Sequence, residues 1–145
     1  MSTDRKAEVT WNGDLMSGSG TITAVTSGAF GPLDVSWPAR SGDEPNGITS
    51  PEELIASAWA ACYSMALSNG LAKDGTPPEK LETSATVTFQ PGEGIVKGAL
   101  TVNATVPGLD AAAFDVAAEN AKQNCPVSKA LAGIPEVTLE ASLAG

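Results

Sequence analysis

Polar and apolar residues alternate over several short stretches of the chain, and one long, mostly apolar run lies between them. Alternation with a period of two predicts a half-buried strand; it occurs over residues 7–15, 20–26, 33–37, 81–89, 95–106 and 137–143. Longer segments without this alternation predict helices over residues 51–72, 111–124 and 125–133, and a Gly-, Pro- and Ser-rich loop precedes the first, over residues 38–49. The order of three strands, a helix, two strands, two helices and a last strand indicates an α+β fold.

The helix over residues 51–72 has clear start and stop signals. Ser50 is a preferred N-cap, Pro51 suits the first helical position and Glu53 completes a capping box. Gly75 and the two prolines that follow soon after it end the helix. Because apolar residues cover a wide part of its circumference, we expect this helix to be central and buried on most sides.

The chain is short and acidic. We expect residues 1–145 to form a single domain. The formal net charge of −9 argues against nucleic acid and anionic membranes as partners, since both are bound by clustered Lys and Arg. Residues 1–11 lack the apolar stretch of a signal peptide, and the apolar run at residues 54–67 is too short and too polar to span a bilayer. The sequence therefore predicts a cytoplasmic protein.

The absence of histidine limits the chemistry that the chain can perform. It has two cysteines, Cys62 and Cys125, and no histidine, which excludes a Ser-His-Asp triad, a Cys-His pair and an imidazole metal ligand. Two thiols alone leave too few soft ligands for a metal site. In a cytoplasmic protein, two cysteines are expected to be reduced, reactive or redox-cycling rather than a permanent disulfide. A peroxide or disulfide chemistry that uses both thiols is the simplest hypothesis.

The residues themselves leave open which thiol is the more acidic. Cys62 lies in the apolar helix, where loss of solvation raises the pKa of a thiol. Cys125 precedes Pro126 at the predicted start of a short helix, and a helix N-terminus lowers the pKa of a thiol.

Two segments around the cysteines resemble the signatures of a known family. Residues 49–67 (TSPEELIASAWAACYSMAL) resemble the first signature of the OsmC/Ohr family, the osmotically inducible and organic-hydroperoxide-resistance proteins. Residues 124–131 (NCPVSKAL) resemble the second. Residues 9–22 and 137–143 are similar to the OsmC branch, so the resemblance covers nearly the whole chain. The Cys-Pro-Val-Ser form and the predicted N-terminal hairpin favour this branch over the Ohr branch.

The resemblance implies a fold and a chemistry. Members of this family are thiol peroxidases with antiparallel strands around a long central helix, and they form intertwined homodimers with active sites at the subunit interface. By position in the two motifs, Cys62 would be the peroxidatic thiol and Cys125 the resolving thiol. The active-site arginine and glutamate of the family match Arg40 and Glu52.

A peroxidatic thiolate in an apolar helix needs a positive charge beside it. Of the two arginines, Arg5 lies in the N-terminal segment and Arg40 in the loop before the helix, so Arg40 is the better candidate. Its guanidinium stays charged and can donate to both sulfur and a peroxide oxygen, and Glu52 would orient it through a bidentate pair. Apolar side chains of the helix would line the substrate site and favour organic hydroperoxides over hydrogen peroxide: Leu54, Ile55, Trp59 and Met65.

The expected cycle needs no metal, flavin or haem. Cys62 attacks the hydroperoxide and becomes a sulfenic acid, Cys125 condenses with it to a disulfide, and a small dithiol or protein thiol reduces that disulfide. The alternative is a binding module of the same fold that holds a fatty acid or another apolar ligand and has inert cysteines.

The spacing along the helix also bears on assembly. Ten residues separate Glu52 from Cys62, which is about 15 Å along a helix. A Glu52 that helps to orient the active-site arginine would therefore do so from the other subunit, so we expect an obligate homodimer with two composite sites.

Overall fold

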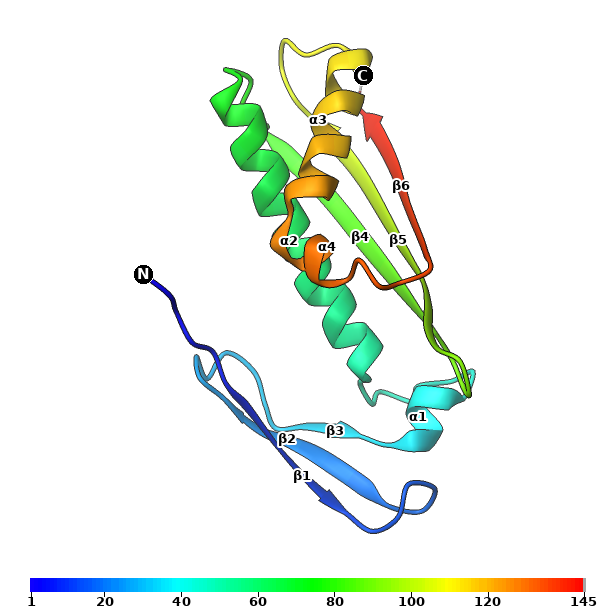
Figure 1. Cartoon of the computed structure of the whole chain (residues 1–145). Coiled ribbons are helices and arrows are strands. Elements are labelled where there is room, and N and C mark those ends of the chain that lie inside the picture. The colour runs from blue at the N-terminus through cyan, green and yellow to red at the C-terminus, as the bar shows by residue number, and fades with distance from the viewer. Residues whose placement is uncertain (145) are drawn as a thin grey trace. The chain divides into compact units, whose positions relative to one another are not determined.

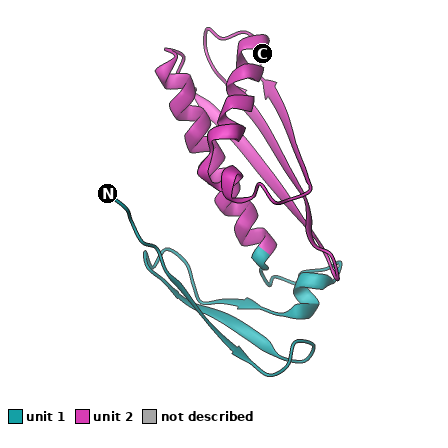
Figure 2. Ribbon diagram, viewed as in Figure 1, with its two compact units in different colours: residues 1–51 teal, residues 52–145 magenta. Residues whose placement is uncertain are grey.

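The chain forms two compact units. A computed structural model describes residues 1–144; the N-terminal unit comprises residues 1–51, and the C-terminal unit begins at Glu52 (Figure 2). Each unit contains its own three-stranded sheet (Figure 1). The mixture of six strands and four helices among the described residues confirms the expected α+β class.

The sheet of the N-terminal unit is antiparallel, with the order β1-β2-β3. It consists of β1 (Ala7–Asn12), β2 (Ser19–Val25) and β3 (Leu33–Val35). The first strand is shorter than predicted because a tight turn follows Asn12. Gly13 adopts a φ of 89°, and the Asp14 carboxylate accepts hydrogen bonds from the Ser17 amide at 2.8 Å and its hydroxyl at 2.9 Å.

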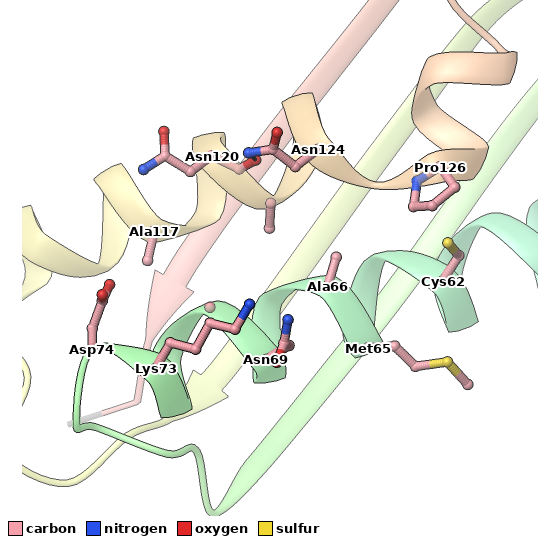
Figure 3. Close-up of a pocket in the computed structure, with 12 residues that line it drawn as sticks. Cys62, Met65, Ala66, Asn69, Lys73, Asp74, Ala117, Asn120, Asn124 and Pro126 are labelled. Atoms are coloured by element: carbon pink, nitrogen blue, oxygen red, sulfur yellow. Dashed lines mark hydrogen bonds between the residues drawn. The ribbon is translucent and has the colours of Figure 1, made fainter. Parts of the chain in front are cut away.

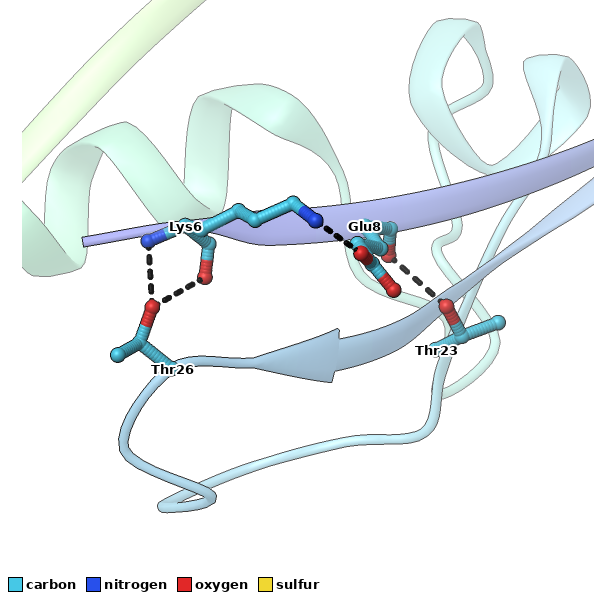
Figure 4. Close-up of polar contacts among 4 residues, drawn as sticks. All are labelled: Lys6, Glu8, Thr23 and Thr26. Carbon is cyan, nitrogen blue, oxygen red and sulfur yellow. Dashed lines mark hydrogen bonds and ion pairs between the residues drawn. The ribbon is translucent and has the colours of Figure 1, made fainter.

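Polar contacts fasten the start of β1 to β2 (Figure 4). The Lys6 amide donates to the Thr26 hydroxyl oxygen at 2.6 Å, and the Thr23 hydroxyl donates to the Glu8 carbonyl oxygen at 3.2 Å. The Lys6 ammonium pairs with the Glu8 carboxylate. These residues are exposed, so the contacts set the strand register more than they stabilise the fold.

A short helix, α1 (Trp37–Ser41), follows β3. The sequence predicts a strand end at Trp37 and a loop at Arg40, and both predictions are wrong. The Ser36 hydroxyl accepts a hydrogen bond from the Ala39 amide at 3.3 Å, and Pro38 lies in the first turn, where its missing N–H is no loss. Arg40 therefore lies in the last turn of a helix.

The C-terminal unit packs helices against one face of a sheet (Figure 1). Its elements are α2 (Pro51–Lys73), β4 (Lys80–Gln90), β5 (Gly94–Thr105), α3 (Ala111–Asn124), α4 (Pro126–Ala130) and β6 (Glu136–Leu143). The predicted hairpin of β4 and β5 is confirmed. One pair departs from the expected antiparallel arrangement, since β6 runs parallel to β5. The chain crosses from the end of β5 through α3 and α4 before β6, and such a crossover brings a strand back in the same direction.

The core of the C-terminal unit follows the periodicity of each element. On α2 every fourth residue is buried: Trp59, Tyr63, Leu67 and Leu71. On β5 every second residue is buried: Leu100, Val102 and Ala104. On α3 the buried face comprises Phe114, Ala118 and Ala121. These three stripes meet in one hydrophobic cluster that also contains Cys125.

The remaining circumference of α2 is less covered than the sequence predicts. Ala58 is exposed, Met65 is 72% exposed, and Leu54, Ile55 and Cys62 are half-buried. Burial on most sides, as the sequence predicts, would therefore need more cover than this single chain supplies. The packing in the C-terminal unit buries a single stripe of the helix, and the apolar residues outside that stripe stay accessible.

Gly98 on β5 tests how tightly this core is packed. A Cβ at this position would lie 2.8 Å from two ring carbons of Trp59, which is fully buried. We expect Gly98→Ala to lower the free energy of unfolding by about 1–3 kcal/mol, the usual cost of overpacking. Gly133→Ala is the control, because a Cβ there meets open space. Urea unfolding midpoints compare the two variants, and equal midpoints would show that the ring can shift at little cost.

Candidate active site

The fold brings the two cysteines together. Cys62 lies in the middle of α2, and Cys125 lies in the connection between α3 and α4. Both are free thiols, and they are close enough for each to act on the ionisation of the other through a side-chain hydrogen bond. Cys62 is half-buried, whereas Cys125 is 0% exposed. Within the C-terminal unit, one thiol is thus accessible and its partner is enclosed.

Pro126 explains why Cys125 lies at an elbow between two helices. A residue before proline avoids the helical region, and Cys125 has a φ of −59° and a ψ of 122°. Its amide still donates to the Ala121 carbonyl at 2.8 Å, which completes α3, and its carbonyl accepts from the Lys129 amide at 3.0 Å, which begins α4. The side chain of Cys125 is thereby held at the start of α4.

The surroundings of the two sulfurs separate their acidities. Burial raises the pKa of Cys62, against the smaller effect of the Val127 amide, and Cys125 raises it further. Burial would also raise the pKa of Cys125, but the Ser128 amide, the Cys62 thiol, the Ser128 hydroxyl and the Val127 amide together outweigh burial and lower it. The amides act by proximity, since Cys125 makes no capping hydrogen bond of good geometry. Within one chain, Cys125 is therefore the more acidic thiol.

A groove of about 710 Å³ runs from Cys62 between α2 and α3 (Figure 3). From α2 the Cys62 sulfur and the Ala66 methyl point towards the α3 side. Near Cys62 the groove also contacts Met65 and Pro126, and Lys73 and Asp74 lie at the end of α2. Its lining is Cys62, Met65, Ala66, Asn69, Gly70, Lys73, Asp74, Ala117, Asn120, Ala121, Asn124 and Pro126.

The predicted substrate-binding residues are distributed differently. Met65 lines this groove, whereas Leu54 and Ile55 are half-buried near the start of α2 and do not line it. Trp59 is fully buried in the core, where its indole Nε1 donates to the Ser128 hydroxyl oxygen at 2.8 Å.

Sequence reasoning missed the polar side chains of the groove. Asn69 and Lys73 are four residues apart on α2, and Asn120 and Asn124 are four apart on α3. Residues at this spacing share one face of a helix. The spacing could have identified two polar stripes facing a common groove.

Of the two charged residues that the resemblance implies, Glu52 belongs to the C-terminal unit and is not among the residues that line this groove. Glu52 is in the first turn of α2 and is 7% exposed, so its carboxylate is enclosed by protein. Arg40 belongs to the N-terminal unit, on α1. Their approach to the thiols stays a prediction.

Residues 1–144 contain neither a candidate metal cluster nor a membrane-spanning helix. No cluster of three or more Cys, Asp or Glu side chains could hold a metal ion. None of the helices there combines the length and apolar character that crossing a membrane requires.

Comparison with known proteins places the chain in a family. The family described as OsmC-like protein matches residues 42–140. Peroxiredoxin OsmC of Escherichia coli (strain K12) is 38% identical over 146 residues, 99% of each chain. An organic hydroperoxide resistance protein of Xanthomonas axonopodis pv. citri is 31% identical over 120 residues, 80% of this chain and 82% of that protein.

Solved structures agree in fold. The crystal structure of an organic hydroperoxide resistance protein from Elizabethkingia anophelis matches with a TM-score of 0.69 and 24% identity, over 99% of this chain and 100% of that one. The family match includes both cysteine motifs, and the Escherichia coli relative matches over nearly the whole chain. The chain therefore belongs to the OsmC-like protein family.

Proposed function

We propose that this protein is a thiol peroxidase that reduces organic hydroperoxides, and hydrogen peroxide less well, through Cys62 and Cys125. The observation that carries the proposal is a pair of free thiols close enough for each to affect the ionisation of the other, one open to a groove and the other enclosed. Relatives named peroxiredoxin OsmC and organic hydroperoxide resistance protein support this chemistry.

Access assigns the two roles. A hydroperoxide in the groove can reach Cys62, whereas Cys125 has no exposed surface. Cys62 then attacks the outer peroxide oxygen, the O–O bond breaks, and an alcohol leaves. The Cys62 sulfenic acid meets Cys125 without a large movement, so that disulfide formation can follow directly. A small dithiol or a protein thiol reduces the disulfide by exchange.

For Cys62 to attack, the order of the two thiol pKa values must be reversed. The enclosed Cys125 is the more acidic thiol in a single chain, so a positive charge is needed to stabilise the thiolate on Cys62. Arg5 precedes β1, is exposed and donates to the Asp4 carbonyl at 2.9 Å. We therefore assign the role to Arg40, with Glu52 as the carboxylate that orients it.

The walls of the groove favour an organic substrate. Next to Cys62 the lining includes the apolar side chains of Met65, Ala66 and Pro126. An alkyl or aryl group of a hydroperoxide can contact these side chains and displace water from them, a gain that hydrogen peroxide cannot make.

A steady-state assay tests the proposed function. Cumene hydroperoxide and hydrogen peroxide are compared as substrates, with dithiothreitol as reductant, on the wild type and on each Cys→Ser variant. We expect turnover of the wild type with a higher kcat/KM for cumene hydroperoxide. Both thiols remaining reduced in the presence of cumene hydroperoxide would instead favour an apolar-ligand binding module.

A prediction about assembly follows from α2. Glu52 and Cys62 are separated by about 15 Å of helix. Met65, which follows Cys62 by three residues on α2, is 72% exposed in one chain. We propose an obligate homodimer in which Glu52 serves the Cys62 of the other copy. Mixing Glu52→Gln protein with Cys62→Ser protein, each inactive alone, should then restore part of the activity once subunits exchange.

Subunit exchange must be shown independently, for example by fluorescence transfer between labelled copies. Proven exchange without recovery of activity, or an active monomer in sedimentation, would contradict the composite site.

A further inference from the structure

A partly buried hydrogen bond links α2 to α4 beside the cysteine pair. Trp59 Nε1 donates to Ser128 Oγ at 2.8 Å, and Trp59 is fully buried. An indole N–H is a donor only, so the serine oxygen is the acceptor. The hydroxyl proton of Ser128 is therefore directed away from Trp59 and available to a second acceptor.

The geometry of α4 brings Cys125 near that hydroxyl as a candidate acceptor. Cys125 is the N-cap of α4 and Ser128 is the third helical residue, and residues three positions apart are neighbours on one side of a helix. The Ser128 hydroxyl is among the groups that, against the effect of burial, lower the pKa of Cys125. A hydroxyl that donates to a sulfur favours the thiolate over the thiol.

The Trp59 ring has little freedom to turn out of this arrangement. Gly98 on β5 lies so close that even a Cβ there would be 2.8 Å from the ring. The indole N–H is thus held in place by packing, and it holds the Ser128 hydroxyl in turn.

Few other titratable groups near Cys125 can affect its pKa. The titratable groups that face it are the Cys62 thiol and the Tyr63 phenol, both on α2. Burial, then Glu119 on α3 and Cys125 itself, raise the pKa of Tyr63, so it stays neutral and donates its proton to the Ala118 carbonyl at 3.0 Å. From β5, the nearby core side chains are apolar.

We propose that Trp59 and Ser128 are positioning residues, a two-step hydrogen-bond relay that aims the Ser128 hydroxyl at Cys125 Sγ and keeps Cys125 ready to attack the Cys62 sulfenic acid. This rests on the proposed function for its consequence. In that step the Cys125 thiolate forms the S–S bond, the S–O bond of the sulfenic acid breaks, and hydroxide leaves. The proton that Cys125 released to solvent on ionising neutralises this hydroxide, so the net product is water. No further oxidant or reductant is consumed.

The relay is tested by titration of Cys125 without peroxide. In a Cys62→Ser background, ultraviolet thiolate absorbance against pH reports Cys125 alone. We expect Ser128→Ala to raise the midpoint by about one pH unit, and Ser128→Thr, which keeps the hydroxyl, to restore it. Trp59→Phe should also raise the midpoint, and the combined Trp59→Phe and Ser128→Ala protein should shift no further than Ser128→Ala.

Ser64→Ala is the matched control, because its hydroxyl bonds Thr83 on β4 at 2.7 Å rather than Ser128 or Cys125. Circular dichroism checks that each variant is folded. If Trp59→Phe does not fold, the titration of Ser128→Ala alone tests the relay. An unchanged midpoint in Ser128→Ala, or a Trp59→Phe shift of equal size with and without Ser128, would overturn the relay.

The consequence for catalysis is read separately, in proteins with both cysteines. The pH midpoint of disulfide formation after one equivalent of hydroperoxide should rise in Ser128→Ala as it does in the titration. A chain that shows the titration shifts but consumes no hydroperoxide would defeat the proposed function and leave the relay standing. An active peroxidase whose Cys125 titration midpoint is the same in the wild type and the Ser128 variants would defeat the relay and leave the proposed function standing.

Discussion

We expect Cys62→Ser to abolish hydroperoxide consumption, with a loss of about 10³-fold or more in the rate of the first oxidation, as for removal of other catalytic nucleophiles. Cys62 is the thiol that opens on the groove, and Cys125, although the more acidic, has no exposed surface through which a hydroperoxide could reach it. A serine hydroxyl at position 62 cannot attack an O–O bond at neutral pH. Rapid mixing with one equivalent of cumene hydroperoxide measures the first oxidation without a reductant.

Cys125→Ser is the complementary variant. It keeps the attacking sulfur, so the first oxidation should proceed, but no disulfide can form and excess hydroperoxide should carry Cys62 to sulfinic acid. Intact mass distinguishes these products. A first turnover that survives in Cys62→Ser and is lost in Cys125→Ser would show that the acidity of Cys125 outweighs access, and that the two roles are reversed.

Arg40→Ala should slow the first oxidation by about 10²- to 10³-fold, the usual cost of losing a donor aimed at a developing negative charge. The physical reason is the acidity order of the thiols: burial raises the pKa of Cys62, and Cys125 raises it further. A guanidinium beside the sulfur would favour the Cys62 thiolate and also polarise the peroxide. The midpoint of urea unfolding should change far less than the rate.

Arg40→Lys should recover only part of the rate, because an ammonium keeps the charge but lacks the planar pair of donors. Arg5→Ala is the matched control, since Arg5 is exposed and its side chain contacts the neighbouring Asp4 carbonyl. Wild-type kinetics and an unchanged Cys62 pKa in Arg40→Ala would contradict the role assigned to Arg40.

The elements with local signals were predictable from the sequence. The Ser50-Pro51 start of α2, the Asp110 cap of α3, whose carboxylate accepts from the Ala113 amide at 2.8 Å, and the turn before Gly94 each mark a boundary within a few residues. The short helix α1 was not, because its five residues span little more than one turn and show no periodicity. Arg40 was assigned to a loop for that reason.

Relations between distant segments were less accessible. Nothing in the alternation of β6 distinguishes parallel from antiparallel pairing with β5, because both patterns bury every second residue. The uncovered side of α2 at Met65 was also hidden, since an apolar helix does not reveal which of its faces a single chain can cover.

The candidate site divides in the same way. The proximity of Cys62 and Cys125 is expected from the resemblance rather than from spacing, and in the structure each thiol affects the pKa of the other. The lowering of the Cys125 pKa has a local signal in Cys125-Pro126, which predicts a helix start at the sulfur. The Trp59 contact with Ser128 had none, because 69 residues separate the two side chains.

The most direct test of the central claim is to count thiols after one equivalent of organic hydroperoxide has been added to the reduced wild type without a reductant. The account predicts that both free thiols disappear together, that one equivalent of alcohol forms, and that peptide mapping finds a single disulfide joining Cys62 to Cys125. Two thiols that remain titratable, with the hydroperoxide unconsumed, would contradict a thiol peroxidase and point to a protein whose cysteines are inert.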